Sequence, residues 1–472
     1  MRQRHSAVRL YTPQQAEPKG HLREKGRTGW LGFFRKLFWY WWLWIAAAFV
    51  AQGADHDNLA IICAVVGFVL YLLAPGEHIP RFGLDSKFPV QSHEFLTTMV
   101  GATGVPFIHN NNVTILNNGD EFYPAMLEAI ANAKKTVTME TYIFWPGETG
   151  LKFAEAMADR CRSGVRVKLL LDAFGSLSIG KDIQNVLKEA GCQVAWYNRI
   201  SPRTIGRFNL RNHRKSLIVD GRVAFTGGAG IGDQWTGNGQ DLAHWHDVQI
   251  RVEGPGATSL QTGFAQNWLE TTGELVSGAE YYPPTDSSGN VSTQTIFSSP
   301  KSGSSAIRIM YDVSIISARK TIYIANPYFI PDDSLLEILV EARRRGVDVK
   351  IMVAGIHNDM RVSRYASIHL YGLLLEAGIE IYEYNRTMLH QKTMVVDHTW
   401  ATVGTTNFDS RSFSLDEESN VCVYDRKLAE KLESIFKEDL KHCDRVTLDE
   451  WRHRGIRKRV FGEICVFLKE QI

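Results

Sequence analysis

Several features that would assign a function quickly are missing from this 472-residue sequence. The six cysteines have no paired spacing, which excludes a disulfide framework and is typical of free thiols in a reducing compartment. The formal net charge is +2, so the chain has no general basic character that would indicate a nucleic-acid partner. Histidine and cysteine do not cluster at metal-ligand spacings, and we interpret His244 and His246 as a strand-edge pair. We therefore predict no metal and no cofactor.

Long uncharged apolar stretches are also scarce, and the two that stand out lie near the N terminus, at residues 37–51 and 59–74. Each is shorter than the roughly 20 residues that span a bilayer, although flanking residues can extend both. A basic leader precedes them, and the linker between them holds Asp55 and Asp57 but no basic residue. By the positive-inside rule, this pattern predicts a multi-pass transmembrane hairpin in the cell (inner) membrane, with the rest of the chain on the cytoplasmic side. A signal peptide or a buried soluble hairpin fits the two runs less well.

One short arrangement of residues occurs twice, once in each half of the chain. Residues 213–220 read HRKSLIVD and residues 390–397 read HQKTMVVD, and a glycine, Gly227 or Gly404, follows each motif. Two histidines and two lysines suit phosphodiester chemistry. One histidine can attack phosphorus, the other can protonate the leaving oxygen, and the lysines can hold the phosphate charge. The alternative is a chance pair of amphipathic strands, which the second copy disfavours.

The repeat extends beyond these motifs, which argues for two related halves. Three further pairs of segments occur in the same order in both halves: 135–146 with 320–331, 164–168 with 346–350, and 190–199 with 377–386. Each half reads as short apolar strands alternating with longer helical segments, and this alternation predicts an α/β sheet covered by helices. We expect two homologous halves related by a pseudo-twofold, with the two histidines meeting between them.

The paired motifs resemble those of the phospholipase D superfamily, and the resemblance covers roughly residues 105–445. Within that superfamily, the segments HRKSLIVDGRVAFTGG, GDQW, IRVEGP and HQKTMVVDHTWATVGTTNFDSRSF are similar to the bacterial cardiolipin synthase branch. The resemblance implies two phospholipase D-like α/β sandwich halves, here preceded by the transmembrane hairpin. It also implies a metal-independent phosphatidyl transfer, in which two phosphatidylglycerols give cardiolipin and glycerol through a phosphatidyl-histidine intermediate.

Six motif residues form the predicted catalytic set: His213, Lys215, Asp220, His390, Lys392 and Asp397. The resemblance implies that His213 is the nucleophile and that His390 acts as general acid and then as base. The lysines would bind the non-bridging phosphate oxygens as point charges. We expect the motif aspartates to brace the lysines and the following turn rather than to attack phosphorus.

A carboxylate behind each imidazole would fix its tautomer and orientation. Asp247, in HWHDVQIRVEG, is the candidate behind His213. Glu418, in LDEESN, is the candidate behind His390. The alternative for both is an ordinary surface acid.

Thr405 and Asn407 are the predicted phosphate-binding residues. The family usually has asparagine three positions after the motif glycine, and the second half matches this with Gly-Thr-Thr-Asn at residues 404–407. The first half departs from the pattern, because Gly230 stands where asparagine is expected. Backbone N–H groups of that Gly-rich stretch are candidates to replace the missing amide.

The predicted segments are a basic, disordered leader at 1–36, the hairpin at 37–75, a linker at 76–104, the first half at 105–272, a Gly/Ser/Pro-rich bridge at 273–304, the second half at 305–445 and a basic amphipathic C-terminal segment at 446–472. The last segment either lies on an anionic membrane surface or packs as a solvated helix on the second half.

Three functions are weighed against each other. A membrane-bound phosphatidyltransferase acting on phospholipids is favoured, with phosphatidylglycerol as the expected substrate and phosphatidylethanolamine as the alternative second substrate. A phospholipase D-type hydrolase would use the same residues and let water finish the reaction. A non-catalytic membrane scaffold is disfavoured because both motifs are intact. The oligomeric state stays open.

Overall fold

The computed structural model describes residues 41–53, 57–72, 84, 87–199, 209–284, 287–300 and 306–467. The chain forms two compact units, residues 1–74 and 75–472. The predicted leader at 1–36 lies outside the described residues, as do parts of the predicted hairpin, linker, bridge and C-terminal segment. All six cysteines are described, and all are free thiols.

The first unit contains two apolar helices, α2 (Trp41–Gly53) and α3 (Asp57–Leu72). They pack against each other, and the Gln52 amide donates to Asp57 Oδ1 at 2.8 Å. Large apolar side chains are exposed on both helices: Leu43, Trp44, Phe49, Val50, Leu59, Ile61, Ile62 and Val65. No helix in the described part of the chain combines the length and the hydropathy that a membrane span requires. The described parts of α2 and α3 have 13 and 16 residues, whereas a span needs about 20.

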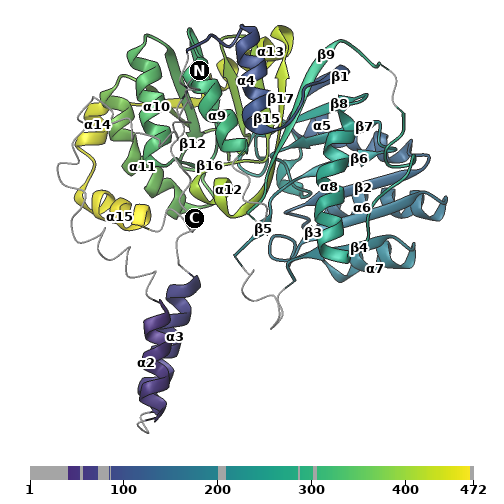
Figure 1. Ribbon diagram of the computed structural model, residues 1–472, viewed down its shortest axis with the longest axis horizontal. Coiled ribbons are helices and arrows are strands. Elements are labelled where there is room, and N and C mark those ends of the chain that lie inside the picture. The colour runs from purple at the N-terminus through teal and green to yellow at the C-terminus, as the bar shows by residue number, and fades with distance from the viewer. Residues whose placement is uncertain are drawn as a thin grey trace, which may run out of the picture. The chain divides into compact units, whose positions relative to one another are not determined.

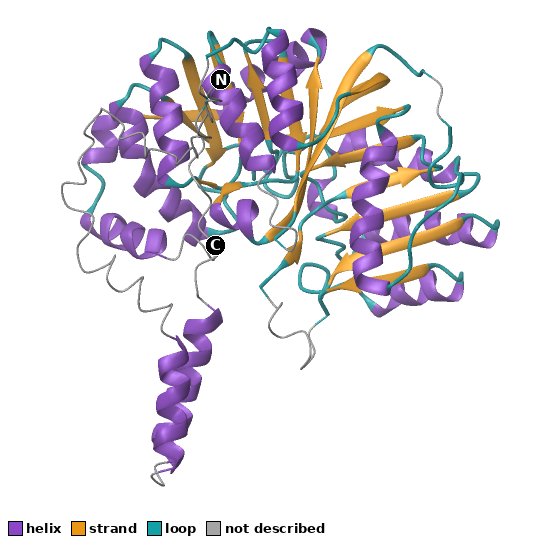
Figure 2. Cartoon of the chain, viewed as in Figure 1, coloured by secondary structure: helices purple, strands orange, loops and turns teal. Residues whose placement is uncertain are grey.

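The second unit holds a large mixed β-sheet covered by helices (Figure 1, Figure 2). It begins with α4 (His93–Thr103) and β1 (Ile108–Asn117). The elements that alternate after β1 are α5 (Gly119–Ala131), β2 (Thr136–Thr141), α6 (Glu148–Arg162), β3 (Arg166–Asp172), α7 (Lys181–Glu189), β4 (Gln193–Tyr197), β5 (Arg211–Asn212) and β6 (Ser216–Val219). The first half ends with β7 (Val223–Gly227), the 3-10 turn η3 (Asp233–Trp235), β8 (Val248–Glu253) and α8 (Ala257–Thr272).

The second half repeats this series. Its first elements are β9 (Val291–Ser298), α9 (Ala306–Ser317), β10 (Thr321–Ala325), β11 (Phe329–Ile330), α10 (Asp333–Arg344), β12 (Asp348–Ala354), α11 (Arg361–Glu376) and β13 (Glu380–Tyr384). The elements that follow are β14 (Thr393–Val396), β15 (Trp400–Gly404), β16 (Phe408–Asp409), α12 (Ser410–Ser414), β17 (Asp416–Tyr424), α13 (Arg426–Asp439), η4 (Leu440–His442), β18 (Cys443–Val446), α14 (Leu448–Arg452) and α15 (Ile456–Phe467).

The strand order repeats from the two sides of the sheet inward. The order is β18-β13-β12-β10-β14-β15-β17-β9-β1-β8-β7-β6-β2-β3-β4. From one side of the sheet inward, β13-β12-β10-β14-β15-β17 corresponds to β4-β3-β2-β6-β7-β8 from the other side. In each half three strands run parallel, β2-β3-β4 or β10-β12-β13, and the strand after the motif histidine joins them antiparallel. Antiparallel β1 and β9 join the two halves at the centre. This order confirms the alternation of strands and helices that the sequence repeat predicts.

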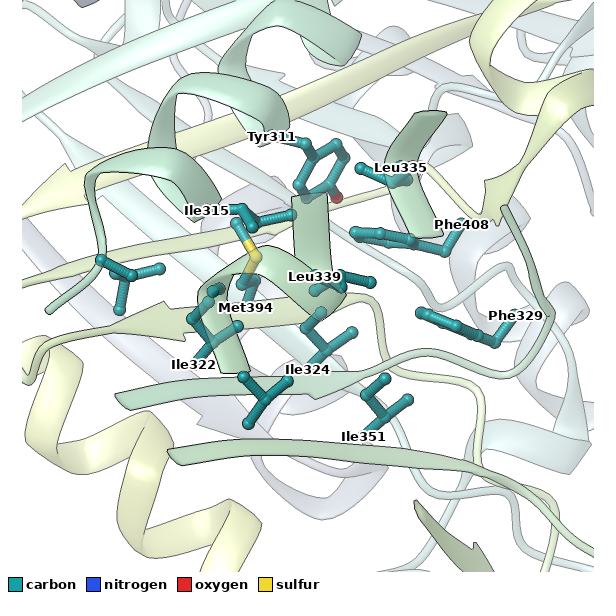
Figure 3. Close-up of a cluster of buried hydrophobic side chains, with 14 of the residues drawn as sticks. Tyr311, Ile315, Ile322, Ile324, Phe329, Leu335, Leu339, Ile351, Met394 and Phe408 are labelled. Carbon is teal, nitrogen blue, oxygen red and sulfur yellow. The ribbon is translucent and has the colours of Figure 1, made fainter. Parts of the chain in front are cut away.

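Buried apolar side chains form a core in each half and one core that the halves share. In the second half, Ile324 of β10 packs in one cluster with Leu339 of α10 (Figure 3). In the first half, α5, α6 and α7 cover a corresponding cluster on β2 and β3. The shared core contains Phe264 of α8 and Leu432 of α13. Because apolar burial is the main favourable term in folding, this shared core holds the two halves together.

Two predicted connecting segments contain elements of the core. The predicted bridge at 273–304 includes β9, which lies between β1 and β17 at the centre of the sheet. Its Val and Thr residues are β-branched and favour a strand. The predicted linker at 76–104 includes α4, where Ser92 Oγ accepts the N–H of Phe95 and so caps the helix. Phe95 and Met99 of α4 are buried in the core of the second half.

The C-terminal segment packs on the second half, which is one of its two predicted placements. Trp451 Nε1 donates to Ile368 O of α11 at 2.7 Å. The rings of Phe461 in α15 and Tyr365 in α11 lie 4.9 Å apart at an edge-to-face angle. This packing leaves one apolar side of α15 exposed.

Candidate active site

Two short backbone pairings join the halves next to the motif histidines. β5, which directly precedes His213, pairs in parallel with the start of β17, and the N–H of His213 donates to Glu417 O at 3.0 Å. On the other side, the N–H of His390 donates to His246 O at 2.7 Å, and the N–H of His246 donates to Met388 O at 2.9 Å. Each histidine is therefore bonded to the backbone of the other half before its own strand enters the sheet.

Both histidines lie near the carboxyl ends of parallel strands. Ser216, at the start of β6, pairs with Glu140 near the end of β2. Thr393, at the start of β14, pairs with Ala325, the last residue of β10. Ligand sites of α/β sheets form at this edge, because the side chains and loops that follow parallel strands converge there.

The carboxylates behind the imidazoles are exchanged relative to the prediction. His213 Nδ1 lies 2.9 Å from Glu418 Oε1, and His390 Nδ1 lies 2.8 Å from Asp247 Oδ2. The predicted pairs, Asp247 with His213 and Glu418 with His390, are therefore wrong. The backbone pairing between the halves explains the exchange. Glu418 directly follows Glu417, whose carbonyl accepts the N–H of His213. Asp247 directly follows His246, whose carbonyl accepts the N–H of His390. All four side chains are buried.

The two motif lysines are buried beside the imidazoles. Lys215 Nζ donates to His213 O at 2.8 Å, and Lys392 Nζ donates to His390 O at 2.5 Å. Lys392 Nζ also lies 3.2 Å from His390 Nε2. The structure thus gathers two imidazoles, two amines and two carboxyl groups from both halves into one site.

Burial sets the protonation states of the basic groups in this site. It lowers the pKa of His213 well below its ordinary value, and Lys215 and Lys392 add to that shift. It also lowers the pKa of His390, and Lys392 adds to that shift. Burial likewise lowers the pKa of Lys215 to about 7 and that of Lys392 to about 8. The lowered pKa keeps His213 neutral near pH 7, as a nucleophilic histidine requires, whereas for His390 the hydrogen bond and charge of Asp247 oppose the shift.

The two carboxyl groups differ in their charge. Burial raises the pKa of Glu418 to about 7, although Lys215 and a hydrogen bond from Thr405 act against the shift. Burial also acts to raise the pKa of Asp247, but the hydrogen bond and charge of His390 outweigh it and leave that pKa lowered. Near neutral pH, His390 therefore faces a full carboxylate, whereas His213 faces a group that is partly protonated.

The motif aspartates lie at the far ends of β6 and β14. Each accepts three backbone N–H groups before or at the start of a neighbouring strand: Asp220 from Lys134, Lys135 and Thr136, and Asp397 from Arg319, Lys320 and Thr321. Their φ values, 53° and 52°, form the turn into the next strand, as expected. The expectation that they brace the lysines is wrong, because a four-residue strand separates each aspartate from its lysine.

The predicted phosphate-binding residues have different surroundings. Thr405 Oγ1 donates to Glu418 Oε2 and so fixes that acid. Asn407 is buried, and its Oδ1 has no hydrogen-bond partner among the described residues. In the first half, a Cβ at Gly230 would lie 2.8 Å from Ile143 Cβ, so the position has no room for the asparagine expected there. Phosphate binding by Thr405 and Asn407 stays a prediction.

Comparison with known proteins identifies the family. A family model described as cardiolipin synthase, PLD-like domain, matches residues 126–268 and 312–440, one segment in each half. The chain is 35% identical to cardiolipin synthase 2 of Bacillus anthracis over 77% of this chain and 71% of that protein. It is 33% identical to the major cardiolipin synthase of Bacillus subtilis over 80% of this chain and 79% of that protein. The chain belongs to the cardiolipin synthase family.

A solved structure supports the same fold. The phosphatidylserine synthase of Haemophilus influenzae superposes with a TM-score of 0.62 at 16% identity, covering 80% of this chain and 100% of that one. The predicted phospholipase D-like α/β fold is confirmed. As a member of the cardiolipin synthase family, the chain is a phosphatidyltransferase of the phospholipase D superfamily.

Aromatic side chains that the motifs do not predict as site residues flank both imidazoles of this cardiolipin synthase family member. The Tyr142 ring lies 5.0 Å from the His213 ring. The rings of Trp235 and Trp245 lie 5.4 Å and 5.6 Å from the His390 ring, and Trp235 Nε1 donates to Asp247 Oδ2. Their positions in the motif segments could have indicated a place at the site, because Tyr142 belongs to the repeated segment 135–146 and Trp235 to GDQW.

An acidic loop residue adds to the site on the side of the second half. Tyr328 OH donates to Asp359 Oδ1 at 2.6 Å, and the Tyr328 ring lies 6.5 Å from the His390 ring. Asp359 belongs to the loop that follows β12, and its charge acts on His390 and Lys392. Tyr328 lies in the repeated segment 320–331, whereas no sequence pattern indicates a role for Asp359.

His246 connects the halves. Its Nδ1 lies 2.6 Å from Asn118 Oδ1, and its Nε2 lies 2.8 Å from Asp439 Oδ2 at the end of α13. His244 is bonded instead to Asp241 at 2.7 Å. The two histidines therefore have separate partners, which agrees with a structural interpretation of the pair.

One group of side chains resembles a metal-ligand set. His213, Asp416 and Glu418 place possible ligand atoms within 4.8 Å of one another. A cation there would have to displace the hydrogen bond between His213 and Glu418 and lie near Lys215 and Lys392. We therefore assign Glu418 to orienting His213, and metal independence stays a prediction.

The observed pairs predict that Glu418 acts through His213 and that Asp247 acts through His390. Glu418→Gln and Asp247→Asn should each lower kcat by about 10²- to 10⁴-fold, because one imidazole loses its fixed tautomer and orientation. Double-mutant cycles on urea unfolding should give a coupling of about 0.5–3 kcal/mol between His213 and Glu418, and almost none between His213 and Asp247. Coupling in the second pair rather than the first would contradict this geometry.

We expect Asp397 to contribute to the stability of the fold rather than directly to the reaction. Asp397→Ala leaves three backbone N–H groups without their acceptor and should lower the free energy of unfolding by about 2–4 kcal/mol. Asp220→Ala is the matched control in the first half, with a smaller expected loss because Asp220 is less buried. Urea unfolding measures both. Lost turnover with unchanged stability would instead place Asp397 in the reaction.

Proposed function

We propose that this protein is a membrane-bound cardiolipin synthase that joins two phosphatidylglycerols and releases glycerol. The observation that carries the proposal is the buried set of two imidazoles, each paired with an acid of the other half, beside two lysines. Such a set provides a nucleophile, a proton carrier and positive charge for a phosphodiester without further groups. The names of the similar cardiolipin synthases support the choice of reaction and substrate.

In the first half-reaction, His213 acts as the nucleophile. Donation of its Nδ1–H to Glu418 leaves the Nε2 lone pair free, and its lowered pKa keeps the ring neutral. A bond forms between Nε2 and phosphorus, and the bond from phosphorus to the glycerol oxygen breaks. Protonated His390, stabilised by the Asp247 carboxylate, gives its proton to that oxygen, and glycerol leaves. The lysines hold the non-bridging oxygens.

In the second half-reaction, a hydroxyl of the second phosphatidylglycerol attacks phosphorus. His390, now neutral, takes the hydroxyl proton, the bond between phosphorus and His213 Nε2 breaks, and cardiolipin is released. Water in place of this hydroxyl would give phosphatidic acid, the product of a hydrolase. Trp235 and Trp245 beside His390 favour transfer, because apolar rings limit the approach of water from that side.

We also propose that residues 37–75 anchor the protein in the cell membrane as a hairpin, with the catalytic unit on the cytoplasmic side. Two features support an anchor. The described parts of α2 and α3 expose large apolar side chains. In the sequence, the apolar residues 37–40 and 73–74 continue both runs, and a basic leader precedes them.

Product analysis tests the function directly. The protein in phosphatidylglycerol vesicles should form cardiolipin and glycerol in equal amounts, with no loss of rate in a chelator. His213→Ala and His390→Ala should each lower this rate by about 10⁴-fold or more, because the reaction loses its nucleophile or its proton carrier. Labelled lipid should become bound to His390→Ala protein and not to His213→Ala protein. The opposite labelling would exchange the roles, and phosphatidic acid as the main product would make the protein a hydrolase.

The lowered lysine pKa values predict the alkaline limb of the rate profile. As pH rises through about 7 and 8, Lys215 and then Lys392 lose their protons and stop holding the phosphate charge. The value of kcat/KM, which reports the free enzyme, should therefore fall as pH increases from about 7 to 9. Lys392→Arg should remove the step near pH 8 and leave the step near pH 7, since a guanidinium keeps its charge. A flat profile across that range would contradict the shifts.

A further inference from the structure

Large apolar side chains are exposed in equivalent loops of the two halves. Leu177, in the loop after β3, is 75% exposed, and Ile356, in the loop after β12, is 65% exposed. Met360 and Val362, where α11 begins, are also exposed. Single exposed apolar residues are common on soluble proteins, but here they follow matching strands at the same edge of the sheet.

Both loops are attached to the active site. Next to Leu177, Ser176 Oγ donates to the backbone oxygen of Tyr142 at 2.9 Å, and the Tyr142 ring packs on the first-half imidazole. In the other loop, Asp359 is bonded to Tyr328, whose ring packs near the second-half imidazole. The apolar side chains of these loops therefore border the site.

Helix α15 adds an exposed apolar stripe near the second loop. Ile456, Val460 and Ile464 recur every four residues along it and are exposed, whereas Gly462 and Cys465 face α11 and are buried. Three exposed basic residues accompany the stripe: Arg457, Lys458 and Arg459. The helix is placed by the contact of Phe461 with Tyr365, in the second turn of α11, which starts directly after the loop.

We propose that loops 173–180 and 355–362 and the exposed stripe of α15 form a lipid-binding face, which rests on an anionic bilayer and places the active site at the headgroups. The inference rests on the proposed function, because a phosphatidylglycerol substrate keeps its acyl chains in the bilayer while its phosphate reaches the site. Apolar side chains next to exposed basic residues are the combination that binds an anionic membrane surface. This face acts in addition to the proposed N-terminal anchor.

A substitution in each of the three elements tests the face. Leu177→Ser, Ile356→Ser and Val460→Ser combined in the full-length protein should lower cardiolipin formation in phosphatidylglycerol vesicles by about tenfold or more. The rate on short-chain phosphatidylglycerol dispersed in detergent should stay within about twofold, because none of the three contacts the reacting groups. Leu275→Ser is the matched control, since Leu275 is equally exposed but follows Glu274, which binds Lys168 near the amino end of β3. An unchanged vesicle rate, or an equal loss on both substrates, would overturn the proposal.

A second measurement does not depend on activity, so it separates failure of the face from failure of the proposed function. A photo-crosslinking amino acid at position 177 should attach lipid when the protein is irradiated in vesicles of phosphatidylglycerol and phosphatidylcholine, and one at position 275 should not. Crosslinking should weaken in phosphatidylcholine alone and after Arg457→Gln with Lys458→Gln. Attachment to a second copy of the chain instead of lipid would assign the face to self-association and refute the inference.

Discussion

The backbone pairing between the two halves is the constraint on which the site depends. β5 pairs with the start of β17, and His390 pairs with His246, so each motif histidine is held by the half that does not contain it. The acid that follows each pairing residue then falls behind the imidazole of the opposite half. Neither half can build its own histidine–acid pair. The repeat has therefore become one catalytic unit, and the shared core under α8 and α13 supplies apolar burial that holds it closed.

Two nearly identical motifs become chemically different through what surrounds them. His390 faces an ionised Asp247 and two tryptophans, whereas His213 faces Glu418, whose pKa burial raises to about 7. A carboxylate stabilises an imidazolium, so one ring is suited to carry a proton. A neutral ring with its Nδ1–H engaged is suited to attack. The proposed division of labour follows from the neighbours of each motif and not from the motif itself.

The sequence predicted the features that repeat locally. The alternation of strands and helices, the two motifs and the turn at each motif aspartate all follow from short-range patterns. It failed where contacts join distant segments. The acids were assigned to the wrong histidines because nothing local indicates that β5 pairs with β17. The motif aspartates were linked to the lysines because they are close in sequence, although an intervening strand carries them to the opposite end. The central strand β9 was read as a bridge because Ser, Gly and Pro surround it.

One site must serve two lipids in succession, and the arrangement of the halves explains how it can. Both imidazoles lie at the carboxyl ends of parallel strands, so the loops of both halves open toward the same edge. In the proposed reaction, departure of glycerol and arrival of the second headgroup can then occur at one opening, beside the same proton carrier. In the proposed mechanism the first phosphatidyl group meanwhile stays bonded to His213, whose position is fixed from the other half by Glu418 and Glu417. Bracing across the interface thus keeps the nucleophile in place while the acceptor changes, which a two-step transfer requires.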